Sequence, residues 1–314
     1  DFYKKKKKSN MLSTLPILII ALISISFAVG NYCINTLFAN KIKVQKQYNL
    51  HLWFGTNQSK TETEILFLSF ASCWILYFAI IVSTGMYHEF KRWEYLYVCT
   101  PMALIYVLIP FFYGMESDKP FFERYYIKAN VWIWILTYVG NFYWTHYFYN
   151  LLGAKYTFDA HRINDVPIAM FMATHAYFCF YHSLTNICIR RMRRTMYYSS
   201  CNSKGKLGLN MLFIGFLAYT TAFMETKTIE GFDYWEFQNR DRALLVGSVV
   251  YMIYFIVSFP KFLQVDEEVK SSNRKVKSIK GAWTIEHVVW DSLGSCMLVT
   301  ILLDFWRLWI GRVA

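Results

Sequence analysis

Apolar segments of membrane-spanning length recur along the whole chain, and they constrain its fold more than any other feature. A helix needs about 20 largely apolar residues to cross the hydrocarbon core of a bilayer. Segments that approach this length are 12–29, 65–86, 95–113, 129–152, 166–189, 207–224, 243–259 and 288–310. Because the bilayer core offers no water to exposed backbone groups, we expect these segments to be helices.

The composition supports a membrane protein and argues against an ordinary soluble domain. The 314 residues are 55% hydrophobic and 17% charged, whereas soluble domains are about 25% charged. Trp and Tyr gather near segment ends, as at Trp93, Trp144 and Trp306, where amphipathic rings favour the headgroup region. The seven cysteines include no C-x-x-C pair, so we expect them to be small core residues and not metal ligands.

The formal net charge of +12 is best explained by orientation in the membrane, because the basic residues sit in short loops between apolar segments. The loops after the first, third, fifth and seventh segments hold 19 Lys and Arg residues, against 7 in the loops between them. The richer set is expected on the cytosolic side. The loop 264–282, with three acidic and then five basic residues, is typical of a solvated link. We expect no nucleic-acid partner.

These patterns predict an all-α fold, a polytopic transmembrane helix bundle with seven core spans and an additional N-terminal apolar segment. The Lys4–Lys8 run lies on the wrong side of the membrane if 12–29 also spans. We therefore expect 12–29 to lie in the interface or to be an added targeting stretch; its basic, apolar and small-residue order also resembles a signal peptide. The predicted domains are a basic and apolar extension, 1–50, and one transmembrane domain, 51–314.

Ionisable residues inside or at the ends of the apolar segments predict a functional site. Such groups are costly in a bilayer and usually face a bundle interior or a cavity. Alternation of the helices brings His146, Glu225 and Asp304 to the same membrane side, with His175 about 13 Å deeper at the helical rise. We expect these four residues to share one pocket, with His182 at its floor.

Each of these residues has a functional and a structural interpretation. Desolvation would keep Glu225 protonated and able to act as an acid, or it could be a helix-end carboxylate that reaches water. Asp304 has ion-pair spacing to Arg307. The histidines could shuttle protons or form hydrogen bonds between helices. His175 and His182 are seven residues apart, whereas a helical metal pair is usually four apart, so we predict no metal site.

No Walker loop, G-x-G-x-x-G, G-x-S-x-G or zinc-type Cys/His array occurs in the sequence, so nucleotide, dinucleotide and serine-hydrolase chemistry lack their usual support. Proton-transfer chemistry on a lipid, without a cofactor, fits the remaining residues. A transporter or proton channel is the main alternative, although it would favour broken helices in paired halves. A membrane acyltransferase is a second alternative and would need an acyl-donor site.

Several long strings resemble the cycloeucalenol cycloisomerase family of plants and protists. The resemblance runs in colinear order from about residue 53 to residue 310. It is carried by residues 141–148, 152–158, 164–167, 174–178, 180–182, 225–226, 234–237, 253–260 and 297–308. The departures are residues 1–50 and the basic insertion 274–280, neither of which touches the matched strings.

The resemblance implies that domain 51–314 is a sterol isomerase of the endoplasmic reticulum membrane. Such an enzyme opens the 9β,19-cyclopropane ring of a cyclopropyl sterol such as cycloeucalenol and gives the 8(9)-unsaturated obtusifoliol. A proton enters at the bridging methylene and another leaves carbon 8, so no cofactor is needed.

The positions of the buried residues suggest roles in that reaction. We predict Glu225 as the acid, His146 as its partner or relay, and His175 or Asp304 as the base. Residues predicted to bind the substrate or stabilise the cation are Tyr143, Trp144, Tyr177 and His182.

Overall fold

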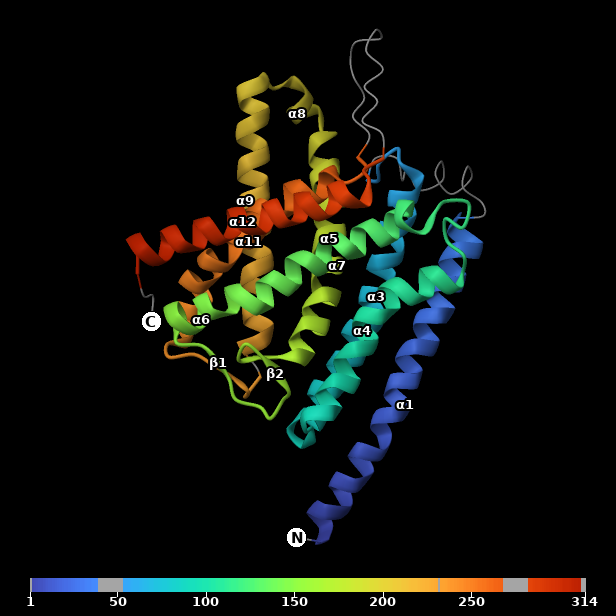
Figure 1. Ribbon diagram of the computed structural model, residues 1–314, viewed down its shortest axis with the longest axis vertical. Helices are drawn as coiled ribbons and strands as arrows, with labels where there is room; N and C mark the ends of the chain where they lie inside the picture. The colour runs from blue at the N-terminus through green and yellow to red at the C-terminus, as the bar shows by residue number, and fades with distance from the viewer. Residues whose placement is uncertain (1, 39–52, 231, 268–281, 312–314) are drawn as a thin grey trace.

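The computed structural model describes residues 2–38, 53–230, 232–267 and 282–311, which are almost entirely helical (Figure 1). The long helices are α1 (Phe2–Tyr32), α3 (Gln58–Ser83), α4 (Arg92–Phe112), α5 (Tyr125–Val139), α7 (Ile168–Arg193), α9 (Ser203–Glu230), α11 (Ser248–Gln264) and α12 (Ile285–Trp309). Shorter helical elements are η1 (Cys33–Phe38), η3 (Met86–Glu89), η4 (Phe121–Glu123), η5 (Gly140–Trp144), α6 (Thr145–Leu152), α8 (Met196–Ser200), α10 (Arg240–Arg242) and η6 (Ala243–Gly247).

Two short antiparallel strand pairs lie in the loops that the structure describes. Strand β1 (Lys155–Tyr156) pairs with β4 (Trp235–Glu236), and β2 (Arg162–Ile163) pairs with β3 (Val166–Pro167). The β1–β4 pair joins the loop after α6 to the loop after α9, which are about 80 residues apart in the sequence.

The all-α polytopic fold is confirmed, but the predicted number of core spans is too high. Six helices in the described part of the chain are long and apolar enough to cross a membrane. They are Thr14–Thr36, Gln58–Ser83, Arg92–Phe112, Ser203–Ile229, Arg240–Gln264 and Ile285–Trp309. Five of the seven predicted core spans are therefore found, together with the N-terminal segment.

The two remaining predicted spans are helical but more polar. Segment 129–152 lies in the continuous run α5–η5–α6, and segment 166–189 covers β3 and most of α7. Their inward faces carry buried polar residues such as Lys128, Asn130 and His175. Asn130 bonds to α4 and to His175, and Lys128 pairs with Asp266 in the turn after α11. Both helices can therefore be less apolar than a lipid-facing span.

The N-terminal apolar segment forms most of α1, which packs along α3 and α4 (Figure 1). The Tyr113 hydroxyl donates to the Phe27 carbonyl at 2.9 Å. A Cβ atom on Gly30 would come within 2.8 Å of the Ile109 side chain, so glycine permits the close approach of α1 to α4. The segment is a candidate span in its own right, while the predicted domain boundary at residue 50 lies outside the described residues.

The loops that connect the helices lie at two ends of the bundle (Figure 1). Helices α7 and α9 run in opposite directions, and α5 and α12 pack along each other across them (Figure 1). The strand pairs and the ends of α6 and α9 lie at the lower end in this view, and α8 lies at the upper end. Both ends contain buried carboxyl groups, but their partners differ.

Three helical runs in the described part of the chain contain π-helical turns, at η1, η5 and η6. Such a turn inserts one extra residue into a helix and frequently occurs at functional sites. The η5–α6 run and η6 approach the same region, because a Cβ atom on Gly247 of η6 would lie 2.9 Å from the Leu152 side chain at the end of α6. Residues of η5 and η6 line the cavity described next.

Candidate active site

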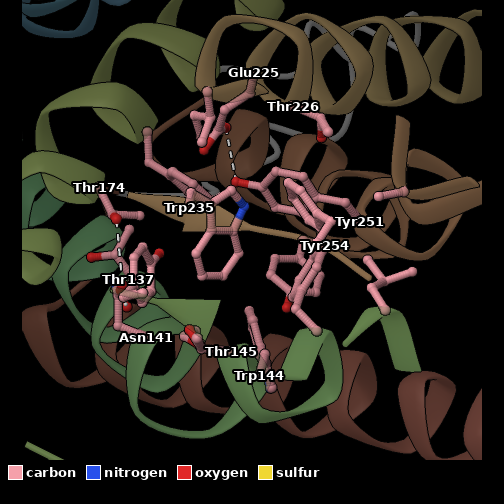
Figure 2. A pocket seen from close by; sticks show the side chains of 18 of the residues that line it. Thr137, Asn141, Trp144, Thr145, Thr174, Glu225, Thr226, Trp235, Tyr251 and Tyr254 are labelled. Carbon is pink, nitrogen blue, oxygen red and sulfur yellow. Dashed lines mark hydrogen bonds between the residues drawn. The ribbon is translucent and has the colours of Figure 1, made fainter. Parts of the chain in front are cut away.

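An open cavity lies between the α5–η5–α6 run, α7, α9 and α11, and residues of β1 and β4 line it as well (Figure 2). It contains about 720 Å³ of empty space, counting the part that opens outward. Aromatic and aliphatic side chains form most of its wall, including Phe148, Phe178 and Trp235. Binding sites for small ligands are typically mainly apolar, with a few placed polar groups.

Glu225 is the carboxyl of this cavity, and its partners are neutral. Its side chain is 9% exposed, and the Tyr251 hydroxyl donates to its Oε2 atom at 2.8 Å, as Figure 2 shows. The phenol of Tyr181 on α7 also lies near the carboxyl. No ion pair found among the described residues includes Glu225.

The sequence of α9 explains why Glu225 faces inward. Ala218, Ala222 and Glu225 follow the i, i+4, i+7 spacing of one helix face, and the two alanines are fully buried. Their small side chains let α9 pack closely on α11. The opposite face carries exposed apolar residues such as Leu212 and Phe216, as expected for a lipid-facing surface.

A second polar group in the cavity lies around the π-helical turn η5. The Asn141 amide donates to the Thr137 carbonyl at 2.8 Å, and the Thr174 hydroxyl lies 3.5 Å from Asn141 Oδ1. Trp144 donates its indole N–H to Thr300 at 2.9 Å and meets Tyr254 edge to face, with ring centroids 4.6 Å apart. In Figure 2 the Asn141 group and the Glu225–Tyr251 pair lie in different parts of the wall.

The β1–β4 pair contributes to the cavity wall from the loops. Tyr156 and Trp235 face each other in the strand register, and their ring centroids are 4.0 Å apart. Gly153 begins the turn after α6 with a φ of 58°, a conformation that glycine adopts without a Cβ penalty. Burial raises the pKa of the Tyr156 phenol, so this hydroxyl stays neutral.

Of the four predicted catalytic residues, Glu225 alone lines the cavity. His146 Nε2 lies 3.0 Å from the Asn164 carbonyl. His175 is buried against Asn130 Oδ1 at 2.9 Å. Asp304 is 44% exposed and accepts hydrogen bonds from Tyr147 at 2.9 Å and Arg307 at 3.0 Å. The expected common pocket is corrected accordingly, and any catalytic role of these three residues stays a prediction.

The physical reason is that alternation fixes the membrane side of a residue but not the direction in which its helix face points. The same reason separates the predicted substrate-binding residues. Trp144 lines the cavity, but its neighbour Tyr143 is 57% exposed. Tyr177 packs against Trp74, with centroids 4.9 Å apart. His182 is a core residue, 2.8 Å from the Phe178 carbonyl and 2.9 Å from Ser258 Oγ.

Several cavity residues were not singled out from the sequence, notably Thr137, Asn141, Tyr251 and Tyr254. Tyr251 and Tyr254 are three residues apart, so they share a helix face. In the sequence, this pair of phenols within an apolar segment is the signal that could have indicated these cavity residues. In the described ranges no group of three or more His, Cys, Asp or Glu residues is arranged to hold a metal ion.

The fold and the site define a class, a polytopic all-α membrane protein with a largely apolar cavity whose lining includes one buried carboxyl. A curated relative, the cycloeucalenol cycloisomerase of Arabidopsis thaliana, is 39% identical over 265 residues, which are 83% of this chain and 90% of that protein. The chain therefore belongs to the cycloeucalenol cycloisomerase family and is an isomerase, as the sequence resemblance predicted. No family model matches the chain, and no solved structure matches it.

Proposed function

We propose that the protein opens the 9β,19-cyclopropane ring of a cyclopropyl sterol such as cycloeucalenol and forms an 8(9)-unsaturated sterol. The observation that carries this proposal is the 39% identity, over most of both chains, to a relative named cycloeucalenol cycloisomerase. The largely apolar cavity with one buried carboxyl supports it, because a sterol is an almost wholly apolar ligand. We further propose that the protein works in sterol biosynthesis as a multi-pass protein of the endoplasmic reticulum membrane.

The reaction converts one isomer into another, so neither an oxidant nor a reductant enters its balance. A general acid protonates the bridging methylene, the strained bond to carbon 9 breaks, and positive charge develops at carbon 9. Loss of the proton at carbon 8 then forms the double bond. A positioned acid of this kind typically contributes a factor of roughly 10² to 10⁴ to the rate.

We assign the acid to Glu225, because its carboxyl lines the cavity and no cation among the described residues holds it as a carboxylate. Aromatic rings in the cavity wall, including Trp144 and Trp235, are suited to stabilise the cation by about 0.5 to 2 kcal/mol each through their electron-rich faces. His146, His175 and Asp304 would have to act through intervening residues.

The proposal is tested by incubating the purified full chain with cycloeucalenol in detergent, without any added cofactor. We expect an 8(9)-unsaturated sterol to accumulate, and Glu225→Gln protein serves as the control preparation. A transporter or channel would leave the sterol unchanged and would instead move solute or protons across proteoliposomes. Absence of conversion by correctly folded protein would refute the proposed function.

A further inference from the structure

The proposed reaction needs a proton donor and a proton acceptor, yet the cavity offers one carboxyl for both tasks. Among its lining residues, Glu225 is the one carboxyl, and the described part of the wall contains no imidazole and no amine. The wall also contains three phenol hydroxyls, those of Tyr156, Tyr251 and Tyr254. Burial disfavours the charged form of a phenol, so these groups hold their own protons near neutral pH and are poor acceptors.

We propose that Glu225 acts twice in each turnover, first as the acid and then as the base, while Tyr251 positions its carboxyl. This inference rests on the proposed function. In the first step the carboxyl O–H bond breaks, a C–H bond forms at the bridging methylene, and the bond from that carbon to carbon 9 breaks. In the second step the carboxylate takes the proton from carbon 8, and the electrons of that C–H bond form the double bond.

Glu225 gives up one proton in this cycle and regains one, so no second residue is needed for the proton balance. The first step leaves a carboxylate beside a cation at carbon 9, and the second step restores the neutral carboxyl. The substrate permits it, because the 9β,19 methylene and the hydrogen on carbon 8 lie on the same face of the sterol nucleus. Carbon 9 is bonded to both reacting carbons, so one carboxyl on that face can serve both.

The geometry at Glu225 gives Tyr251 its role. Tyr251 is buried on α11, lines the cavity and donates to Oε2 at 2.8 Å. This bond leaves Oε1 to carry and deliver the proton. Hydrogen bonds to an ionised acceptor are roughly twice as strong as those between neutral groups. The Tyr251 bond therefore stabilises the carboxylate that forms during the reaction more than the resting carboxyl, which favours the transition state.

The pH dependence of kcat/KM for cycloeucalenol tests the double role. The titratable groups that face Glu225 in the described part of the chain are phenols. They are Tyr177 and Tyr181 on α7, Tyr251 and Tyr254 on α11, and Tyr156 on β1. A single group that must start protonated gives a profile that is level at low pH and falls at high pH, whereas a separate acid and base give a bell. Sterol binding measured in parallel corrects for unfolding in acid. A bell-shaped profile in folded protein would overturn the proposal.

Tyr251→Phe tests the positioning role, with Tyr147→Phe as its matched control. The Tyr147 hydroxyl bonds to Asp304 outside the cavity. We expect Tyr251→Phe to lower kcat by roughly tenfold while KM changes less than about twofold, because the bond acts on the charged state. Tyr147→Phe should leave both constants unchanged.

If Tyr147→Phe lowers kcat and Tyr251→Phe does not, Asp304 is the base and the proposal is wrong. If Tyr251→Phe fails to fold, the pH profile of the unaltered protein still decides the question. Failure of the proposed function is distinct, since it appears as no conversion by any preparation.

Discussion

Two buried carboxyl sites lie at opposite ends of the bundle, and one has neutral partners whereas the other has charged partners. In the described part of the chain, the Glu225 carboxyl near the end of α9 faces phenols and no cation. Glu64 near the start of α3 receives both ends of the Arg190 guanidinium, at 2.6 and 2.9 Å, and the Asn186 amide at 2.8 Å. Glu267 binds the same guanidinium, with its closest contact at 2.8 Å.

The Glu64 site belongs to a larger ion-pair cluster. Lys60 contacts Glu267 at 3.0 Å, and Lys128 contacts Asp266 at 2.8 Å. The members of the ion-pair cluster are Lys60, Glu64, Lys128, Arg190, Asp266 and Glu267. Its three cations and three anions balance, and together they tie α3, α5 and α7 to the residues that follow α11.

The comparison teaches that burial alone does not make a carboxyl chemically available. A carboxylate matched by buried cations stays ionised, and removing one partner strands the other charge. A carboxyl with neutral hydrogen-bond donors leaves no partner charge unmatched when it gains or loses a proton. The ion-pair cluster therefore fits a structural role, and Glu225 fits proton transfer.

The largest expected effect comes from Glu225→Gln, which keeps the size and removes the dissociable proton. Turnover of cycloeucalenol should fall by roughly 10² or more, with thermal stability and sterol binding close to those of the unaltered protein. Glu123→Gln, at an exposed position, is the control. Near-normal turnover of Glu225→Gln would contradict the assignment of proton transfer to Glu225.

Glu64→Gln should have the opposite phenotype. Arg190 would keep Glu267 but lose its most buried counter-charge, so we expect a loss of about 3 kcal/mol in the free energy of unfolding. Denaturant unfolding in detergent measures it, while turnover per folded molecule should stay unchanged. Reduced turnover at full stability would mean that the ion-pair cluster also takes part in the reaction.

Acid should weaken the ion-pair cluster through Glu267. Burial alone would raise the pKa of Glu267, but hydrogen bonds from Arg190 and the charge of Lys60 outweigh it and lower the pKa to about 2. Because the folded-state pKa lies below the usual value, this stabilisation is complete above the usual carboxyl range and is lost as pH falls toward 2. Melting temperatures of Glu267→Gln should fall less steeply over that acid range, and equal slopes for both proteins would contradict this.

The smallest effect is expected from Asp304→Asn. Asp304 is half exposed and lies outside the cavity, in an ion pair with Arg307. Exposed pairs typically contribute about 0 to 1 kcal/mol, so turnover and stability should both change little. A loss of turnover comparable to that of Glu225→Gln would bring Asp304 back as the base.

The sequence predicted the helices, the family and the cavity carboxyl, because these depend on composition, long strings and local spacing. Glu225 follows two alanines on one helix face, which is visible in the sequence. The span count was wrong because α5 and α7 carry polar residues that other helices cover. Whether other helices cover a given helix depends on tertiary packing, which cannot be read from the hydropathy of one segment.

The remaining cavity residues and the ion-pair cluster could not be predicted for the same reason. Asp266 and Glu267 were expected in a solvated link, but both pair with buried cations; the rest of that loop, 268–281, lies outside the described residues. Helix alternation predicts His175 and Asp304 on the same membrane side as Glu225, but both face other neighbours. Sequence periodicity gives a face, and only packing decides what that face meets.

A single turnover in D2O tests the central claim most directly. Enzyme in excess, equilibrated in D2O beforehand, is mixed with cycloeucalenol, and the product sterol is analysed by mass spectrometry and NMR. Because an equilibrated carboxyl carries deuterium, the account predicts one deuterium in the newly formed methyl group. Conversion that gives an unlabelled methyl group would contradict proton delivery by an exchangeable group of the protein.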